Sequence, residues 1–241
     1  MIVRPIKTRV FREGEDLPTF IKEHIPALRS GSVLAVTSKI VALAERRILT
    51  VRNRKEKEVL IRKESSWALQ THPGWWWTRK DGTLLVNAGI DDSNADGKLI
   101  LLPRDSYKAA TELRTKLMRA YKIKKLGVVI TDSRISPMRA GVTGLAVGYA
   151  GFRGIRDYRG KPDIFGRKLK VTMTDVADSL ATAATLVMGE GAERQPLAIV
   201  EGAPVEFVGK VDRREVRIPE KKDMYWPLFN RVGGKRRRRK G

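Results

Sequence analysis

The segment LGVVITDS (126–133) sets the strongest limit on how this chain folds. An unbroken apolar run rich in valine and isoleucine predicts a strand buried within a sheet. Asp132 and Ser133 follow at its expected end, where they either cap the next segment or bind a ligand. The sequence therefore predicts a buried strand with oxygen-bearing side chains placed directly after it.

A second predicted strand, TLLV (83–86), is followed in the same way by NAGIDDSN (87–94). Aspartate, asparagine and serine favour turns, so turn formation is the simpler interpretation for any single residue of this loop. Carboxylates at strand ends also commonly hold Mg²⁺ or Mn²⁺ beside a phosphate. A third polar corner, MGEGAER (188–194), follows a predicted helix. On spacing alone, turns and a divalent-cation site for a phosphate substrate both stay open.

Three helices are expected from apolar periodicity and capping residues. Ser38 would cap the first, after the strand-like run VLAVT (33–37). Asp105 or Ser106 would cap the second, over 106–122, and Thr174 or Asp175 would cap the third, which ends at Gly189. The second helix should turn one face to the core, formed by Ala110, Leu113, Leu117 and Ala120.

Further strands are expected at 99–103, 143–152, 167–174 and 196–202. Residues 52–80 look charged and then irregular, ending near three adjacent tryptophans, Trp75–Trp77. Neighbouring side chains of a strand or helix do not share one side, so we expect some of these rings in the core and others at the surface.

The chain contains no cysteine and two histidines, His24 and His72. Thiolate chemistry is thereby excluded, and catalysis or metal binding would depend mainly on carboxylate, amide, hydroxyl and cationic side chains. No apolar run is long enough to span a bilayer, and the N-terminus lacks the apolar region of a signal peptide. These features predict a soluble cytoplasmic protein that does not bind a membrane.

Positive charge dominates, with 49 Lys and Arg against 27 Asp and Glu and a net charge of +22. Such a field attracts anions, from nucleotides to nucleic acid, without selecting among them. Neither a P-loop nor a GxGxxG motif is present, so a nucleotide would need a less common cradle. Arg139 lies just beyond TDS with Arg134, Arg153 and Arg156; these cations either clamp phosphate oxygens or are ordinary surface residues.

Seven segments, taken in order, resemble one known family. They are VTSKIVALAERR, NAGIDDSN, LLPRD, GVVITDSRISPMRAGVTGLAVGYAGF, DYRGKPDIFGRKLKVT, VADSLATAATLVMGEG and PLAIVEG. Together they cover roughly residues 5–202 and resemble the coenzyme F420-0:γ-glutamyl ligase family, which attaches glutamate to a deazaflavin cofactor precursor. The segments SNADGKLILLPRD, TDSRISPMR and DYRGKPDIFGR resemble a bacterial branch of this family assigned to folate metabolism.

The resemblance implies an α+β fold of mixed sheets with helices, an intertwined homodimer, and an amide-forming ligase. It implies that GTP and two divalent cations, Mn²⁺ or Mg²⁺, drive the joining of L-glutamate to coenzyme F420-0 or folate through an acyl phosphate. The implied metal ligands are Asp91, Asp132, Ser133 and Glu190. The implied nucleotide site consists of Thr8, Arg9, Val10, Phe11, Ser38, Lys39, Asn94, Gly189, Glu190 and Gly191. Catalysis would depend on Asp91, Asp132 and Arg139.

The chain departs from the family pattern at three positions near these segments. Leu43 stands where the family commonly has lysine, Arg46 where it has glycine, and Ser133 where it has threonine. The first change removes one candidate phosphate contact. The third keeps a hydroxyl, so metal binding can survive it.

The resemblance places one ligase-like domain at 1–232, with two subdomains as an alternative. The basic tail at 233–241, which contains KRRRRK, is expected to be disordered. The net positive charge, the basic tail and Trp75–Trp77 also fit a nucleic-acid-binding protein, in which the tail could bind the nucleic acid. An inactive ligase homologue that acts as a scaffold is the third alternative.

Overall fold

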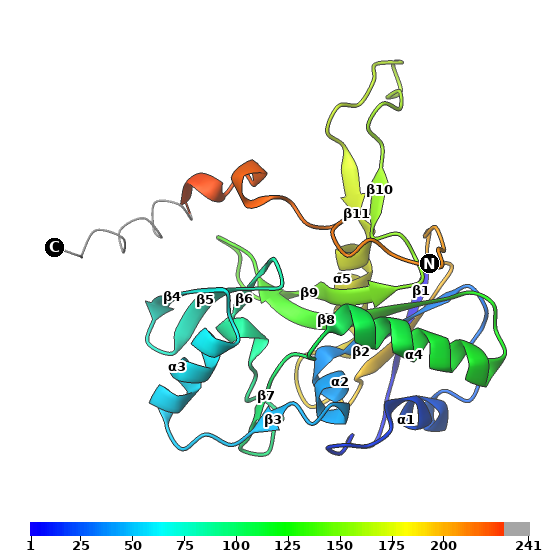
Figure 1. The fold of residues 1–241 in the computed structure, drawn as a ribbon. Helices are drawn as coiled ribbons and strands as arrows, with labels where there is room; N and C mark the ends of the chain where they lie inside the picture. Colours follow the sequence, from blue (N-terminus) through cyan, green and yellow to red (C-terminus); the bar gives the residue numbers. More distant parts are fainter. Residues whose placement is uncertain (229–241) are drawn as a thin grey trace.

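A five-stranded mixed sheet forms the centre of the molecule (Figure 1). The computed structural model describes residues 1–228. The strands lie in the order β1-β12-β2-β8-β9. Their bounds are β1 Ile2–Ile6, β2 Ser32–Thr37, β8 Leu126–Ile135, β9 Val142–Ala150 and β12 Leu197–Glu201. The prediction of an α+β fold with mixed sheets is confirmed.

In this central sheet, β2 and β8 are parallel and the other neighbouring strands are antiparallel. Thr37, the last residue of β2, lies beside Thr131 of β8. Ser38 and Lys39 follow the first of these threonines, and Asp132 follows the second. The parallel register therefore brings residues from two distant parts of the sequence to one place.

Helices cover both faces of the central sheet (Figure 1). Leu34 and Val36 of β2 pack with three helices on one face, and Val33 and Ala35 pack with one helix on the other. The bounds are α1 Leu17–His24, α2 Ser38–Ala44 and α4 Ser106–Tyr121 on the first face, and α5 Val176–Met188 on the second. Burial on both faces explains why the central strands are continuous apolar runs and do not alternate.

A bulge in β9 changes which of its side chains face which helices. Ile130 of β8 lies opposite Gly148, whereas the next residue, Thr131, lies opposite Ala146. Val147 is thus the extra residue of a β-bulge. Beyond it, the alternation of the strand between the two faces of the sheet is reversed.

Two glycines of β9, one on each side of this bulge, allow helices to approach the strand closely. A Cβ added to Gly144 would lie 2.4 Å from the carbonyl oxygen of Ala181 in α5. A Cβ added to Gly148 would lie 2.4 Å from the carbonyl carbon of Ser106 in α4. Because α4 and α5 cover opposite faces, the bulge lets a single strand present a glycine to each of them.

A second, three-stranded sheet lies beside the central one (Figure 1). It consists of β4 Trp67–His72, β5 Trp75–Lys80 and β6 Thr83–Val86, with α3 Arg54–Lys63 packed against it; a short pair, β3 Ile48–Leu49 and β7 Leu99–Ile100, lies nearby. The expected irregular structure at 52–80 is therefore wrong. In α3 the apolar side chains are the adjacent Val59, Leu60 and Ile61, and of these Ile61 alone is buried, so the segment offers little apolar sequence from which to predict a helix.

The tryptophans confirm the expected division between core and surface. Trp76 is 2% exposed and packs in the core of the second sheet, whereas Trp75 is 55% exposed.

An arm formed by β10 Ile155–Asp157 and β11 Met173–Asp175 projects from the body of the molecule (Figure 1). The strand expected at 167–174 is wrong for all but its last two residues, since residues 167–172 lie in the loop of the arm. Ile164 and Phe165 of this loop are 91% and 88% exposed. The homodimer stays a prediction.

The chain after β12 returns across the molecule toward the second sheet (Figure 1, orange). The Glu215 carboxylate accepts hydrogen bonds from the Tyr149 hydroxyl at 2.6 Å and from the Gly154 amide at 2.7 Å. Glu220, in the short helix η2 Glu220–Lys222, forms an ion pair with Arg79 of β5. Residues 203–228 thus connect the central and second sheets, whereas the basic tail at 233–241 lies outside the described residues.

The helix predictions are largely confirmed. The Asp105 side chain caps α4 by accepting from the Lys108 amide, and the Asp175 side chain caps α5 by accepting from the Asp178 amide, each at 2.9 Å. Gly189 follows the last residue of α5, as expected.

Four local predictions are wrong. Ser38 is the first residue of α2, and Thr37 occupies the cap position without a side-chain cap bond. Ala120 is exposed, because Tyr121 turns inward and bonds to the Ile25 carbonyl. The strand expected at 99–103 contains two residues, and β8 does not end at Asp132 but continues to Ile135. No helix within residues 1–228 has the length and hydropathy needed to cross a bilayer.

Candidate functional site

A cavity of about 490 Å³ opens where β2 gives way to α2, beside the middle of β8. Its walls come from the segment after β1, the β2–α2 junction, the loop after β6, the middle of β8 and the chain after α5. The predicted site residues that line it are Thr8, Arg9, Val10, Phe11, Ser38, Lys39, Asp91, Asn94, Asp132, Ser133, Gly189, Glu190 and Gly191. The structure therefore brings together side chains that are far apart in the sequence.

On one wall, Lys39 and Asp91 form an ion pair with 2.9 Å between Nζ and Oδ2. The Ser93 amide donates to Asp91 Oδ1 at 2.7 Å, and the Lys39 ammonium donates to the Ser93 carbonyl at 2.7 Å. Partial burial acts to raise the pKa of Asp91, but the bonds from Ser93 and Lys39 outweigh it and hold this pKa below its usual value. Asp91 is therefore ionised at neutral pH, with Lys39 as its counter-charge.

Asp132 is in the opposite electrostatic situation. Burial of its carboxylate raises its pKa to about 7, and the nearby negative charges of Asp91 and Glu190 add to this rise. The Ser133 amide donates to Asp132 Oδ1 at 2.9 Å and offsets part of it. The cavity thus contains a carboxylate whose negative charge is only weakly compensated.

The polar corner after α5 closes the cavity on another side. The Ser133 hydroxyl donates to Glu190 Oε1 at 2.7 Å, and the Asn94 amide donates to the Gly191 carbonyl at 3.1 Å. Gly189 has φ +80°, and a Cβ there would lie 2.4 Å from the Glu193 carboxyl carbon. Glycine at this position therefore permits both the backbone conformation and the close approach.

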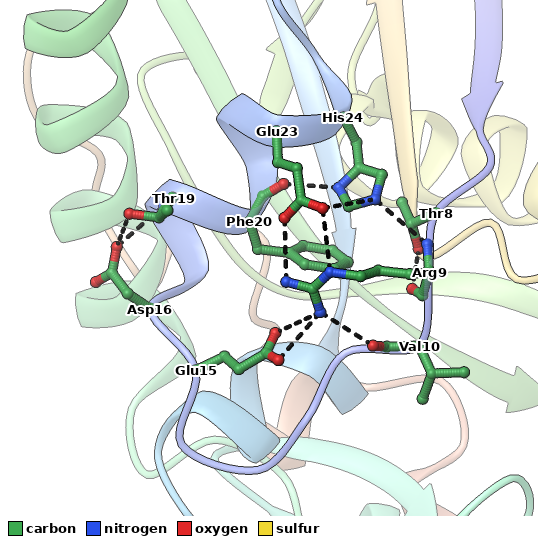
Figure 2. Close-up of polar contacts among 9 residues, drawn as sticks. All are labelled: Thr8, Arg9, Val10, Glu15, Asp16, Thr19, Phe20, Glu23 and His24. Atoms are coloured by element: carbon green, nitrogen blue, oxygen red, sulfur yellow. Dashed lines mark hydrogen bonds and ion pairs between the residues drawn. The ribbon is translucent and has the colours of Figure 1, made fainter.

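The segment Thr8–Phe11 forms the remaining wall (Figure 2). The Arg9 guanidinium is bound by two carboxylates, Glu15 at 2.8 Å and Glu23 at 3.0 Å. These bonds raise the pKa of Arg9, the larger effect coming from Glu23, and balance its charge. Arg9 lines the cavity, but its guanidinium is already paired.

Sequence reasoning missed part of the lining. Thr185, Glu193, Arg194 and Gln195 all contribute to the cavity. Unlike Lys39 and Arg9, the Arg194 side chain has no carboxylate partner within residues 1–228. The polar run GAERQ after the glycine corner was the available signal, but its residues look like an ordinary surface loop.

Arg139 does not join this cavity. It lies in the exposed turn between β8 and β9, where its amide donates to the Ser136 carbonyl at 3.2 Å. Of the positions that depart from the expected family pattern, Leu43 and Ser133 line the cavity, where they present an apolar side chain and a hydroxyl. Arg46 has φ +54°, a conformation that glycine adopts without strain.

The carboxylates do not form a ready-made metal site. In the described part of the chain, no group of three or more histidine, aspartate or glutamate side chains is arranged to hold an ion. Lys39 pairs with Asp91, and Ser133 bonds to Glu190. The donors available are nonetheless all oxygen, which suits hard divalent cations. Asp132 forms no ion pair within residues 1–228, and the charge of Lys39 offsets only part of the rise in its pKa.

The pKa of Asp132 leads to a prediction about stability. Because this pKa is higher in the folded chain than the value of 3.8 for an unfolded aspartate, ionisation of Asp132 destabilises the fold as pH rises toward 7. Without nucleotide or divalent cations, Asp132→Asn should match the wild type at about pH 3.5, below the unfolded pKa, and exceed its unfolding free energy by roughly 2 kcal/mol at about pH 8. Urea denaturation at both pH values measures this difference, and a pH-independent difference would contradict the assignment.

The comparisons with known proteins agree with one another. The family model described as F420-0:Gamma-glutamyl ligase matches residues 5–202. The coenzyme F420:L-glutamate ligase of Archaeoglobus fulgidus is 34% identical over 89% of this chain and 92% of its own length. The enzyme of the same name from Methanopyrus kandleri is 35% identical over 84% of this chain and 86% of its own, and that from Methanococcus maripaludis is 38% identical over 69% and 68%. The matched region contains every segment that lines the cavity, and the chain belongs to the F420-0:γ-glutamyl ligase family of amide-forming enzymes.

Proposed function

We propose that this protein joins L-glutamate to a carboxylate of coenzyme F420-0, with GTP and divalent cations as co-reactants. The observation that carries the proposal is the common cavity of Asp91, Asp132 and Glu190, three carboxylates from separate parts of the chain. Its volume of about 490 Å³ suits a nucleotide-sized ligand. The names of the three relatives support coenzyme F420 as the acceptor class.

Asp91, Asp132, Ser133 and Glu190 would hold one or two Mn²⁺ or Mg²⁺ ions. The weakly compensated charge of Asp132 supports this assignment, because a cation there would restore its ordinary ionisation. Asp91 would have to exchange its bond to Lys39 for one to the ion. When bound, such ions supply positive charge to the phosphate oxygens during transfer.

The reaction proceeds in two steps. An oxygen of the acceptor carboxylate attacks the γ-phosphorus of GTP, the bond to the β–γ bridging oxygen breaks, and GDP leaves. The α-amino nitrogen of glutamate then attacks the carbonyl carbon of the acyl phosphate, and inorganic phosphate and a proton depart. The protein contributes positioning and electrostatic stabilisation in both steps.

Two cations of the cavity would act on the phosphates. Lys39, once released from Asp91, and Arg194, which has no carboxylate partner in residues 1–228, would both meet phosphate oxygens. Asn94 would hold the glycine corner in place through its bond to the Gly191 carbonyl. Arg9 would contribute by shaping the cavity wall, because Glu15 and Glu23 occupy its guanidinium.

Product mass tests the acceptor. Purified protein is incubated with GTP, Mn²⁺ and L-glutamate, together with either coenzyme F420-0 or tetrahydrofolate. We expect F420-0 to gain the mass of one or more glutamate residues, with one GDP formed for each residue added, and chelation of the metal to stop both. A mass gain on tetrahydrofolate alone would identify folate, and not F420-0, as the acceptor. No mass gain on either acceptor would refute the proposal. Asp92→Asn is the matched active control, because Asp92 is exposed and bound to Lys57 outside the cavity lining.

A further inference from the structure

The wall segment Thr8–Phe11 is held in place mainly by contacts outside the sheet. β1 ends at Ile6, and the next backbone bond to the central body runs from the Thr8 amide to the Arg194 carbonyl at 2.9 Å. The other polar attachments of the segment come from α1 and from the loop that precedes this helix (Figure 2). The position of this wall therefore depends on α1.

The helix α1 is a firm support. The Asp16 side chain caps it by accepting from the Thr19 amide at 3.0 Å and from the Thr19 hydroxyl at 2.7 Å. Phe20 and Ile21 are 1% and 0% exposed in the core. The last turn of α1 is thus fixed to the core, and it directs two side chains, Glu23 and His24, toward the segment (Figure 2).

The hydrogen bonds of His24 define its tautomer. Its Nδ1 lies 2.8 Å from the Phe20 carbonyl oxygen, and because a carbonyl can only accept, Nδ1 carries the proton. In the neutral ring Nε2 is then an acceptor, and the Arg9 amide donates to it at 3.3 Å. The ring also packs on Phe20, with 4.5 Å between centroids. Neutral His24 is therefore shaped to hold the backbone of the segment at Arg9.

Charged groups surround this contact. Glu23 Oε1 lies 3.9 Å from His24 Nε2 and accepts from Arg9 Nε at 3.1 Å. Glu15 binds the far side of the same guanidinium, which lies 4.9 Å from the centre of the Phe20 ring. Figure 2 shows three charged side chains near the ring: Glu23 of α1, Arg9 of the segment and Glu15 of the loop between them.

We propose that His24 is a positioning residue which, when neutral, holds the backbone of the Thr8–Phe11 wall at Arg9 and, when protonated, loosens the wall at that point and weakens nucleotide binding, while Phe11 stays anchored in the core. The nucleotide part of this inference rests on the proposed function. A proton on Nε2 would point at the Arg9 amide, so two donors would face each other and the bond would be lost. The imidazolium would also compete with Arg9 for Glu23.

The kinetic test follows the KM for GTP at about pH 6 and about pH 8. We expect the KM of the wild type to be about fivefold higher at the lower pH, with kcat changed less than twofold. All assays contain saturating Mn²⁺, which would keep Asp132 ionised at both pH values. Under these conditions His24→Gln, which can still accept from the Arg9 amide, should keep a low KM at both. His24→Phe keeps the ring contact with Phe20 but not the acceptor, so its KM should be high at both. His72→Gln, on exposed β4, should behave like the wild type.

A spectroscopic test on the nucleotide-free protein separates this inference from the proposed function. Nitrogen-15 NMR of the two imidazoles should find His24 protonated at Nδ1 near pH 8, with His72→Gln identifying the signal. Hydrogen exchange at the Arg9 amide, corrected for its intrinsic pH dependence, should become faster as His24 gains its second proton. A proton on Nε2 at pH 8, or a pH-independent exchange free energy at Arg9, would overturn the inference even if GTP turnover is confirmed. If the NMR and exchange results are as expected but GTP does not bind at either pH, the proposed function is refuted. The role of His24 in holding the Arg9 backbone is then still supported.

Discussion

Asp132→Asn is expected to reduce GTP-dependent glutamate ligation by about a thousandfold or more, while the protein stays folded. Asparagine keeps the size of the side chain but cannot supply the charge that a divalent cation needs. It also removes the repulsion from Asp91 and Glu190 that, together with burial, raises the pKa of Asp132. Activity and stability should therefore change in opposite directions at about pH 8. GDP release with saturating Mn²⁺, read beside urea unfolding of the same preparation, measures both.

Asp92→Asn provides the matched comparison for this prediction. Asp92 is adjacent to Asp91 in the sequence, but its carboxylate bonds to Lys57 at 2.6 Å and does not line the cavity. Its loss should leave activity within about twofold of the wild type. Full activity of Asp132→Asn would show that Asp132 is not needed for the reaction. Equal losses of activity in Asp132→Asn and Asp92→Asn would instead indicate a general effect of the lost negative charge.

Gly144→Ala is expected to destabilise the protein by about 3 kcal/mol. The new Cβ would lie 2.4 Å from the Ala181 carbonyl oxygen and 2.6 Å from the Thr185 hydroxyl oxygen. Because the first of these is backbone of α5, the helix itself must move away from β9. It would also strain the bond from the Thr182 hydroxyl to the Gly144 carbonyl, which measures 2.9 Å. Chemical denaturation gives the change in unfolding free energy.

Gly209→Ala is the control for the loss of a glycine. No atom lies within 4 Å of the Cβ it would introduce, and its φ is not in the left-handed region. Its unfolding free energy should stay within about 0.5 kcal/mol of the wild type. Because Thr185 also lines the cavity, a folded Gly144→Ala protein should in addition show a higher KM for GTP. Wild-type stability of Gly144→Ala would mean that α5 is not packed against β9 as described.

The sequence predicted four of the five strands of the central sheet, and β2, β8 and β12 were the clearest because most of their residues are buried. It did not predict β1, which is only partly buried. Runs such as VLAVT and LGVVI have few alternatives, and Asp105, Asp175 and Gly189 mark helix ends by local bonds that any chain would use. The prediction of secondary structure failed where apolar runs and capping residues are weak. The helix α3 carries a single buried residue. In the arm, residues 167–172 bond to residues 158–163 only at scattered positions, which do not make a regular strand.

For the candidate site, too, the sequence predicted some features and not others. Every site residue that the resemblance implied lines the cavity except Arg139, but the resemblance did not name Thr185, Glu193, Arg194 or Gln195. It could not reveal how their charges are paired. That Lys39 neutralises Asp91, or that Glu15 and Glu23 occupy Arg9, depends on the relative placement of distant segments. The functional roles of these residues stay predictions until the variants are measured.

The loop that carries Asp91 and Asn94 follows the second sheet, whereas Asp132 belongs to the central one. A ligand that contacts both Asp91 and Asp132 would therefore connect two sheets that share no strand. Binding and docking are then thermodynamically coupled. If the bound molecule stabilises the contact between the two sheets, a more stable contact strengthens the binding of that molecule by the same free energy. Substitutions at the seam between the sheets, far from any substrate atom, would consequently change affinity.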